Sequence, residues 1–207
     1  MVTWLIPVLL SPGFLQGDRW IIERTVVDTT TSDVTTIKRH DKLSYSVVRV
    51  EAELTVVSCE SGAWDSKLKP AKKLVSFKPN GSLLGIEDEP NETMGRISRM
   101  EWTATEARQG IEWSRKWPAS SNLLEAKVTV RPTSKTAKDT TLTVTYKEGP
   151  VTKCTGVIKI LNNVPVVEDA IITIYGAPGL ASAKPTGITV TDRLKEIHLV
   201  GRDRITG

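Results

Sequence analysis

The clearest pattern along the chain is the alternation of apolar and polar residues, which predicts β-strands with one buried face and one face in water. Residues 45–57 show it best: Val48, Val50 and the apolar positions that follow are expected to share the buried face, with Arg49 on the opposite face. Other runs of the same character are residues 18–28, 34–42, 74–78, 82–87, 123–131, 140–147, 155–161 and 166–175. The pattern favours sheet over helix throughout.

Short polar segments between these runs predict turns. Pro79-Asn80-Gly81 predicts a hairpin between residues 74–78 and 82–87, because proline presets the turn and Asn-Gly readily adopts positive φ. Near the C-terminus, residues 188–191 and 197–200 predict a last hairpin-like pair. Further turns are predicted at residues 29–33, at 135–139 and at Asn162-Asn163. Residues 103–109, followed by Gly110, predict a short helix.

A Gly-x-x-Trp start occurs twice, at Gly17 and at Gly110, and each is followed by strand-like runs. This repetition predicts two similar β halves, residues 18–89 and 110–175, joined by a connector at residues 90–109. An acidic segment with proline and glycine, residues 87–95, marks the boundary. Outside the two halves lie an N-terminal arm or signal remnant, residues 1–17, and a loop with a C-terminal hairpin, residues 176–207.

Composition agrees with the pattern. The 207 residues are 39% hydrophobic and 25% charged, within the range of soluble globular proteins, and such a chain can bury a core without metals. We therefore predict an all-β protein with a large antiparallel curved sheet, arranged as a half-barrel or sandwich, with at most one or two short helices.

The net charge of +4 is only mildly basic, and the cationic residues are spread along the chain. One basic stretch, residues 67–73, is interpreted as a solvated loop in preference to a binding patch. No nucleic-acid partner is predicted.

Two cysteines, Cys59 and Cys154, lack the spacing of a zinc site. If the chain is exported, they could form one long-range disulfide, which would contribute roughly 3–5 kcal/mol on a loop-entropy argument. Buried free thiols are the alternative. No metal and no cofactor is predicted.

The first residues, MVTWLIPVLLSPGFLQG, contain an apolar run too short to span a bilayer. The run has the apolar centre of a secretion signal but lacks a basic start and an Ala-x-Ala site. A signal remnant and a packed first strand are both open. The Thr-rich β composition favours an extracellular or cell-envelope (periplasmic) location.

Catalytic motifs are missing from the sequence. It has only two histidines, His40 and His198, and no Gly-x-Ser-x-Gly elbow, His-Glu-x-x-His or P-loop. We predict that the protein is not an enzyme and has no catalytic residues.

Six tryptophans are many for a chain with two phenylalanines. Core and sheet packing is their expected role, and a stacking platform or the lining of an apolar cavity is the alternative. The candidate ligand or packing aromatics are Trp20, Trp64, Trp102, Trp113 and Trp117.

Three segments resemble uncharacterised bacterial secreted or lipoprotein-type β domains: Gly17-Asp18-x-Trp20, Phe77-x-Pro79-x-Gly81 and residues 156–174. The resemblance implies a large antiparallel sheet, curved or half-closed, and an envelope location, and it supplies no binding residues. The chain departs from those domains because it has neither the lipobox cysteine nor the basic start.

These observations lead to a non-catalytic envelope or extracellular protein that binds an apolar small molecule or a protein partner in a continuous cavity. The alternative is a self-assembling structural protein, such as a surface-layer, filament or virion component. Peripheral membrane association and a homo-oligomer are compatible with either.

Overall fold

The structure is a computed structural model that describes residues 13–29, 37–64, 67, 69–79, 81, 83–86, 105–119, 124–175 and 187–202. In this part of the chain, 11 strands form one antiparallel sheet with the order β5-β4-β3-β2-β1-β11-β10-β9-β8-β7-β6. A single turn of helix, α2 (Thr105–Arg108), accompanies them. The fold is nearly all β, as the alternating pattern predicts.

The strands follow one another as neighbours along each half of the sheet. They are β1 (Arg19–Asp28), β2 (Ile37–Val50), β3 (Thr55–Ala63), β4 (Ala71–Phe77), β5 (Leu83–Ile86), β6 (Trp113–Trp117), β7 (Ala126–Lys135), β8 (Asp139–Glu148), β9 (Val151–Leu161), β10 (Val167–Tyr175) and β11 (Gly187–His198). Because β1 pairs with β11, the first and last strands meet in the middle of the sheet.

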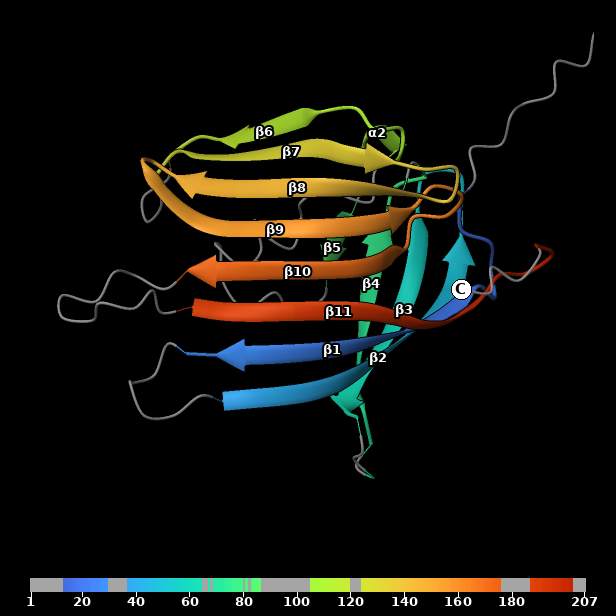
Figure 1. Ribbon diagram of the computed structural model, residues 1–207. Coiled ribbons are helices and arrows are strands. Elements are labelled where there is room, and N and C mark those ends of the chain that lie inside the picture. The colour runs from blue at the N-terminus through green and yellow to red at the C-terminus, as the bar shows by residue number, and fades with distance from the viewer. Residues whose placement is uncertain are drawn as a thin grey trace, which may run out of the picture.

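The sheet is open and strongly curved. Figure 1 shows β6 to β11 and β1 running side by side, while β3, β4 and β5 pass behind them at a steep angle. Strands β5 and β6 are the two ends of the strand order. The predicted antiparallel curved sheet is confirmed.

Several predicted turns are confirmed. Strands β4 and β5 pair on either side of the Pro79 turn, where Gly81 has a φ of 89°. The turn at Asn162 joins β9 to β10, and residues 136–138 join β7 to β8.

The predicted buried face of residues 45–57 is wrong for Val48 and Val50, whereas Val56 is buried as expected. Val47 is 2% exposed, whereas Val48 and Val50 are 42% and 41% exposed. A register shift between Val47 and Arg49 and a turn closed by Glu51 N–H donating to Leu54 O interrupt the run. Strict alternation assumes an unbroken strand, and a one-residue slip exchanges the two faces.

The predicted C-terminal hairpin is also wrong. Residues 187–198 form one continuous strand, β11, which pairs with β1 on one side and β10 on the other. Residues 192–196, whose polar character suggested a turn, stay within β11. The pairing register with β1 shifts there, between Ile21 and Ile22.

Two apolar clusters fill the sheet's buried face. One is built from β7, β8, β9 and β10 with Ala107 of α2, and Tyr146, Leu142 and Ile158 lie at its centre. The other joins the start of β1 to β2, β3 and β4, and also includes the turn after β9.

Residues 13–17 of the predicted N-terminal arm pack on the sheet. The ring of Phe14 stacks on Trp20, with centroids 5.2 Å apart. The fully buried carboxylate of Asp18 accepts hydrogen bonds from the N–H groups of Leu15 (2.7 Å) and Val200 (2.9 Å), and it pairs with Arg202. Asp18 of the Gly-Asp-x-Trp segment therefore links residues 13–17 to residues 200–202.

The duplication stays a prediction. Gly17 and Gly110, which open the two Gly-x-x-Trp segments, both have positive φ, at 92° and 79°. Some sequence expectations lie outside the described residues: residues 1–12, 30–33, 87–102 and 176–186.

Candidate functional site

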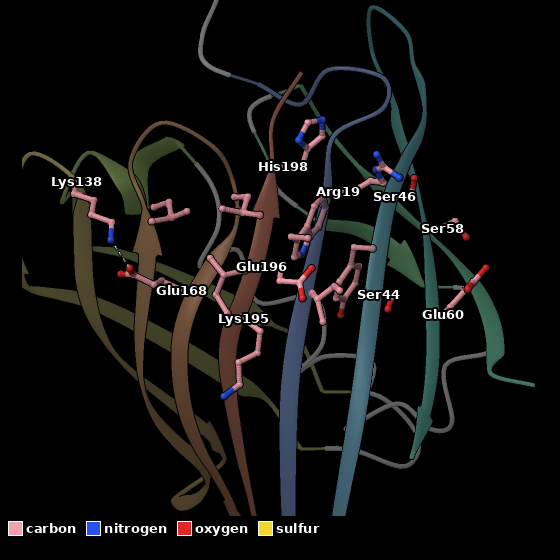
Figure 2. A pocket seen from close by; sticks show the side chains of 16 residues that line it. Arg19, Ser44, Ser46, Ser58, Glu60, Lys138, Glu168, Lys195, Glu196 and His198 are labelled. Carbon is pink, nitrogen blue, oxygen red and sulfur yellow. Dashed lines mark ion pairs between the residues drawn. The ribbon is translucent and has the colours of Figure 1, made fainter. Parts of the chain in front are cut away.

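A groove of about 1030 Å³ lies against β1, β2, β3 and β11 and reaches the ends of β9 and β10. Figure 2 shows Lys138 and Glu168 on one side of it and Ser58 and Glu60 on the other, with Glu196 between them. Its volume is in the range of small-molecule sites. We refer to this feature as the groove.

One row of hydrogen-bond donors crosses the groove over four strands. Ser58 lies opposite Ser46, Ser46 opposite Arg19, and Arg19 opposite His198. Directly opposed residues of neighbouring antiparallel strands share one face of the sheet. Arg19 and His198 are exposed, and neither forms an ion pair with any described residue. We call these four residues the donor row.

A second row lies two residues further along the same strands. Glu60 lies opposite Ser44, Ser44 opposite Ile21, and Ile21 opposite Glu196. Glu60 and Glu196 are exposed, and in the described part of the chain neither has an ion-pair partner. We call Glu60 and Glu196 the carboxylate row.

The far wall carries a compact ion network. Glu168 pairs with Lys138 at 2.9 Å and with Lys159 at 3.0 Å, and Lys159 also reaches Asp139 at 3.3 Å. Burial opposes ionisation of Glu168, but the hydrogen bonds from the two lysines outweigh it and lower the pKa of this carboxyl. These charges neutralise one another, unlike the charges of the two rows.

Apolar and aromatic residues complete the lining. They are Trp20, Ile21, Tyr45, Leu161, Leu194 and Ile197. The rings of Trp20 and Tyr45 are stacked with centroids 5.0 Å apart, and Phe14 extends the stack on the other side of Trp20. Trp20, Tyr45, Leu194 and Ile197 alternate along their strands with the residues of the two rows and pack in the cluster of β1 to β4, so of the apolar lining Ile21 shares the face of the rows. The lining differs from the purely apolar cavity expected from the sequence.

A charged pair lies two residues from Ile22 on the same face of β1. Arg24 donates from Nε and Nη2 to the two carboxylate oxygens of Asp192, each at 2.7 Å. Burial disfavours the charged guanidinium, yet the hydrogen bonds to Asp192 outweigh that effect and raise the pKa of Arg24. The pair links β1 to β11.

Near this pair, burial raises the pKa of the Tyr45 hydroxyl, and the neighbouring Cys59 contributes in the same direction. Burial also raises the pKa of the Cys59 thiol, partly offset by the hydrogen bond with Tyr45. Both groups are therefore neutral at pH 7 and are not activated nucleophiles.

The two cysteines are free thiols. Cys154 is 1% exposed inside the cluster of β7 to β10, whereas Cys59 packs against the other cluster. Burial raises the pKa of Cys154 to about 12. The two side chains lie in different clusters, with Cys154 buried and Cys59 partly exposed, and whether the cysteines pair stays a prediction.

The candidate tryptophans do not gather into one site. Trp20 is 4% exposed in the aromatic stack, and Trp113 and Trp117 pack against the cluster of β7 to β10. Trp64 stacks on His40 with centroids 5.1 Å apart. Only Trp20 borders the groove, and Trp102 lies outside the described residues.

The two histidines occupy exposed positions. His40 contacts Glu23 at 2.8 Å, and Glu23 also pairs with Lys195 at 2.5 Å. His198, expected at the edge of the core, lies at the exposed end of β11. Among the described residues it forms no hydrogen bond with a serine of the groove, as a serine hydrolase would require.

Sequence reasoning did not identify the charged and serine residues of the groove. Arg19, Ser46 and His198 are far apart in the chain, and they meet because β1 pairs with both β2 and β11. No local motif carries that information.

Among the described residues, no group of three or more His, Cys, Asp or Glu side chains is placed to hold a metal ion. In the same part of the chain, no helix has the length and apolar character needed to cross a membrane.

The chain matches no protein-family model and no curated protein. Among solved structures it is similar to one described as lipid-protein interactions in lipovitellin, with 10% identity and a TM-score of 0.31. That match covers 94% of this chain and 27% of the lipovitellin chain. A TM-score this low supports no argument about function, which therefore depends on the groove.

Proposed function

We propose that this protein is a non-catalytic binding module that holds an amphipathic small molecule in the groove. The observation that carries the proposal is the composition of the lining: Ile21 lies on the same strand face as Arg19, Glu196 and His198, and these three polar residues lack ion-pair partners in the described structure. A ligand with an apolar part and a polar end would satisfy both parts.

The energetics favour such a ligand. Burial of apolar surface contributes roughly 25 cal/mol per Å², so an acyl or similar group on the apolar part supplies affinity. The paired strands β1, β2 and β11 give that part a fixed shape, which limits the entropy lost on binding. The polar end fixes orientation.

An envelope or extracellular location belongs to the same proposal. Its support is the Thr-rich β composition and the resemblance to secreted β domains. Self-assembly stays the alternative, but residues 13–17 of the arm assigned to it pack on their own sheet through Phe14 and through Arg202, which donates to Gly13 O at 3.0 Å.

The test is a calorimetric titration of a monoacylglycerol, used below its micellar concentration, into the protein and into Ser46→Trp. Ser46 lines the groove beside Arg19, and the indole would fill the space that a ligand needs there. We expect saturable binding to the wild type and none to the variant. Equal binding by the two proteins, with the variant folded by circular dichroism, would remove the groove as the site.

A further inference from the structure

We propose that the exposed face of β6, β7 and β8 binds a linear acidic polysaccharide along a row of lysines. Lys116 lies directly opposite Lys127, and Lys127 lies directly opposite Lys147. We call these three residues the lysine row. None of the three lines the groove, so this surface is a second site that goes beyond the proposed function.

Strand pairing brings the three lysines together. They are distant in the sequence and meet because β7 pairs with β6 on one side and with β8 on the other, at one end of the strand order (Figure 1). Directly opposed residues share one face of a sheet, and all three lysines are exposed. Their neighbours Ala126, Val128 and Tyr146 alternate with them and pack in the cluster of β7 to β10. The lysine row therefore lies on the face that is turned away from this cluster.

The lysine row is unfavourable for the isolated sheet, because like charges directly opposite one another destabilise strand pairing. In the described part of the chain none of the three lysines forms an ion pair. Two acidic residues lie within two positions of the row along these strands. Glu148 is buried on the other face, where the Tyr146 hydroxyl donates to it, and Glu125 is a single exposed acid two residues before Lys127. An anionic partner would offset the repulsion that remains.

A row of hydroxyls runs beside the lysine row on the same face. Ser114 lies opposite Thr129, and Thr129 lies opposite Thr145, each two residues from a lysine on its own strand. The two rows are about 6.8 Å apart, and neighbouring strands are about 4.8 Å apart. Ammonium groups donate charge-assisted hydrogen bonds to carboxylate or sulfate groups, and hydroxyls both donate to and accept from sugar oxygens. The strip thus offers the two kinds of contact that an acidic sugar chain requires.

The shape of the surface favours an extended polymer. Small molecules bind in concave sites, whereas the lysine row lies along an open sheet face. Cations at regular intervals match a chain that carries its anionic groups at regular intervals. A single-stranded nucleic acid would use aromatic rings on which its bases stack. The rings of β6, Trp113 and Trp117, pack against the cluster of β7 to β10 and are therefore on the other face.

The residues around the row also favour a polysaccharide over a membrane surface. Peripheral attachment to a membrane combines cations with apolar side chains that enter the interface. Here the row next to the lysines consists of hydroxyls. Val157 and Ile171, an exposed apolar pair on the same face, lie two rows away from the lysine row.

The experiment is a calorimetric titration of a heparin octasaccharide into the full chain, with maltooctaose as the neutral control of equal length. We expect the heparin octasaccharide to bind and maltooctaose not to bind. Three lysine contacts should make the affinity fall on the order of tenfold between about 50 mM and about 200 mM salt, because counterions are released on binding.

A triple variant removes the lysine row: Lys116→Gln, Lys127→Gln and Lys147→Gln. It should weaken binding of the heparin octasaccharide about tenfold or more and flatten the salt dependence. It should fold, as circular dichroism can verify, because it removes a repulsion. The matched control removes three charges from exposed positions that flank β4, and should bind like the wild type: Lys67→Gln, Lys69→Gln and Lys78→Gln.

A charge-conserving variant tests the alignment of the row. Lys127→Thr combined with Thr129→Lys keeps the net charge and moves the middle cation into the hydroxyl row. We expect weaker binding than in the wild type, because the three cations no longer lie in one line. Binding as tight as in the wild type would overturn the requirement for a row.

The remaining outcomes decide between this partner and others. If the heparin octasaccharide does not bind, or if both triple variants lose affinity equally, the proposed site is overturned. If a single-stranded oligonucleotide or phosphatidylglycerol vesicles bind more tightly than the heparin octasaccharide, the choice of partner is overturned. Ser46→Trp, which fills the groove, should bind the heparin octasaccharide like the wild type, so the two proposals can fail separately.

Discussion

At the scale of single residues, Asp18 joins the segment before β1 to the segment after β11. Its buried carboxylate receives donors from both ends of the described chain, through Leu15, Val200 and Arg202. Burying a carboxylate without such partners would lower the free energy of unfolding. The partners of Asp18 come from the segments just before β1 and just after β11.

We predict that Asp18→Asn lowers the free energy of unfolding by about 3 kcal/mol, because Arg202 loses its partner and an amide nitrogen meets backbone N–H groups. Urea denaturation followed by tryptophan fluorescence measures the change. Asp169→Asn, exposed on β10 and without an ion pair in the described structure, should stay within about 0.5 kcal/mol of the wild type. Equal effects of the two variants would contradict this role for Asp18.

The buried thiol of Cys154 makes stability depend on alkaline pH. Its pKa is raised from 9.0 to about 12, so the folded state favours the neutral thiol. The resulting stabilisation is fully present below about pH 9 and is lost as the pH rises toward 12.

We therefore expect Cys154→Ala to make the decline of unfolding free energy over that pH interval shallower. Val130→Ala, which also removes volume from the same cluster, should lower stability without changing the slope. Denaturation series at several pH values provide the comparison. An unchanged slope in Cys154→Ala would show that the thiol does not titrate differently in the two states.

At the scale of elements, Gly187 illustrates how closely two strands approach. A Cβ at this position would lie 2.7 Å from the carbonyl oxygen of Ile174, whereas a Cβ at Gly62 in β3 would meet nothing closer than 3.5 Å. The pairing of β10 with β11 therefore needs glycine at one of its ends, for space rather than for backbone conformation.

We predict that Gly187→Ala destabilises the protein by about 1–3 kcal/mol, through displacement of the backbone. Gly62→Ala should be neutral or slightly stabilising, because alanine reduces the entropy of the unfolded chain. Thermal unfolding of both variants separates the two effects. A Gly187→Ala protein as stable as the wild type would contradict this steric requirement for glycine between β10 and β11.

Strands and turns could be predicted from the sequence, but faces and partners could not. Alternation located β7 and β8, and the Pro79 turn identified the hairpin of β4 and β5, because these signals are local. Val47, predicted on the polar face of β2, packs in the core, and the register shift that follows it interrupts the alternation. The polar run of β11 suggested a turn because its two partner strands could not be foreseen.

The groove depended on that missing information. Its donor row takes Arg19 from β1, His198 from β11 and two serines from β2 and β3. Long-range pairing is a property of the whole sheet, and a single sequence contains no local mark of it. The tryptophans, which composition made conspicuous, mostly serve packing.

At the scale of the whole molecule, the seam between β1 and β11 holds the two runs of strands together. The Arg24–Asp192 pair crosses this seam beside the apolar clusters. We predict that Arg24→Met costs about 2 kcal/mol, less than a fully buried pair, since the Arg24 side chain is 34% exposed.

The double variant Arg24→Met with Asp192→Leu should recover much of that loss, because no unpaired charge is then left at the seam. A double-mutant cycle in urea measures the coupling. Strictly additive losses would contradict a direct interaction between the two side chains.

The groove is the central claim, and native mass spectrometry of gently purified protein tests it most directly. Wild-type protein is expected to carry one amphipathic molecule per chain, and Ser46→Trp, prepared in the same way, to carry none. A wild-type protein without any adduct, or an adduct retained equally by Ser46→Trp, would contradict binding in the groove.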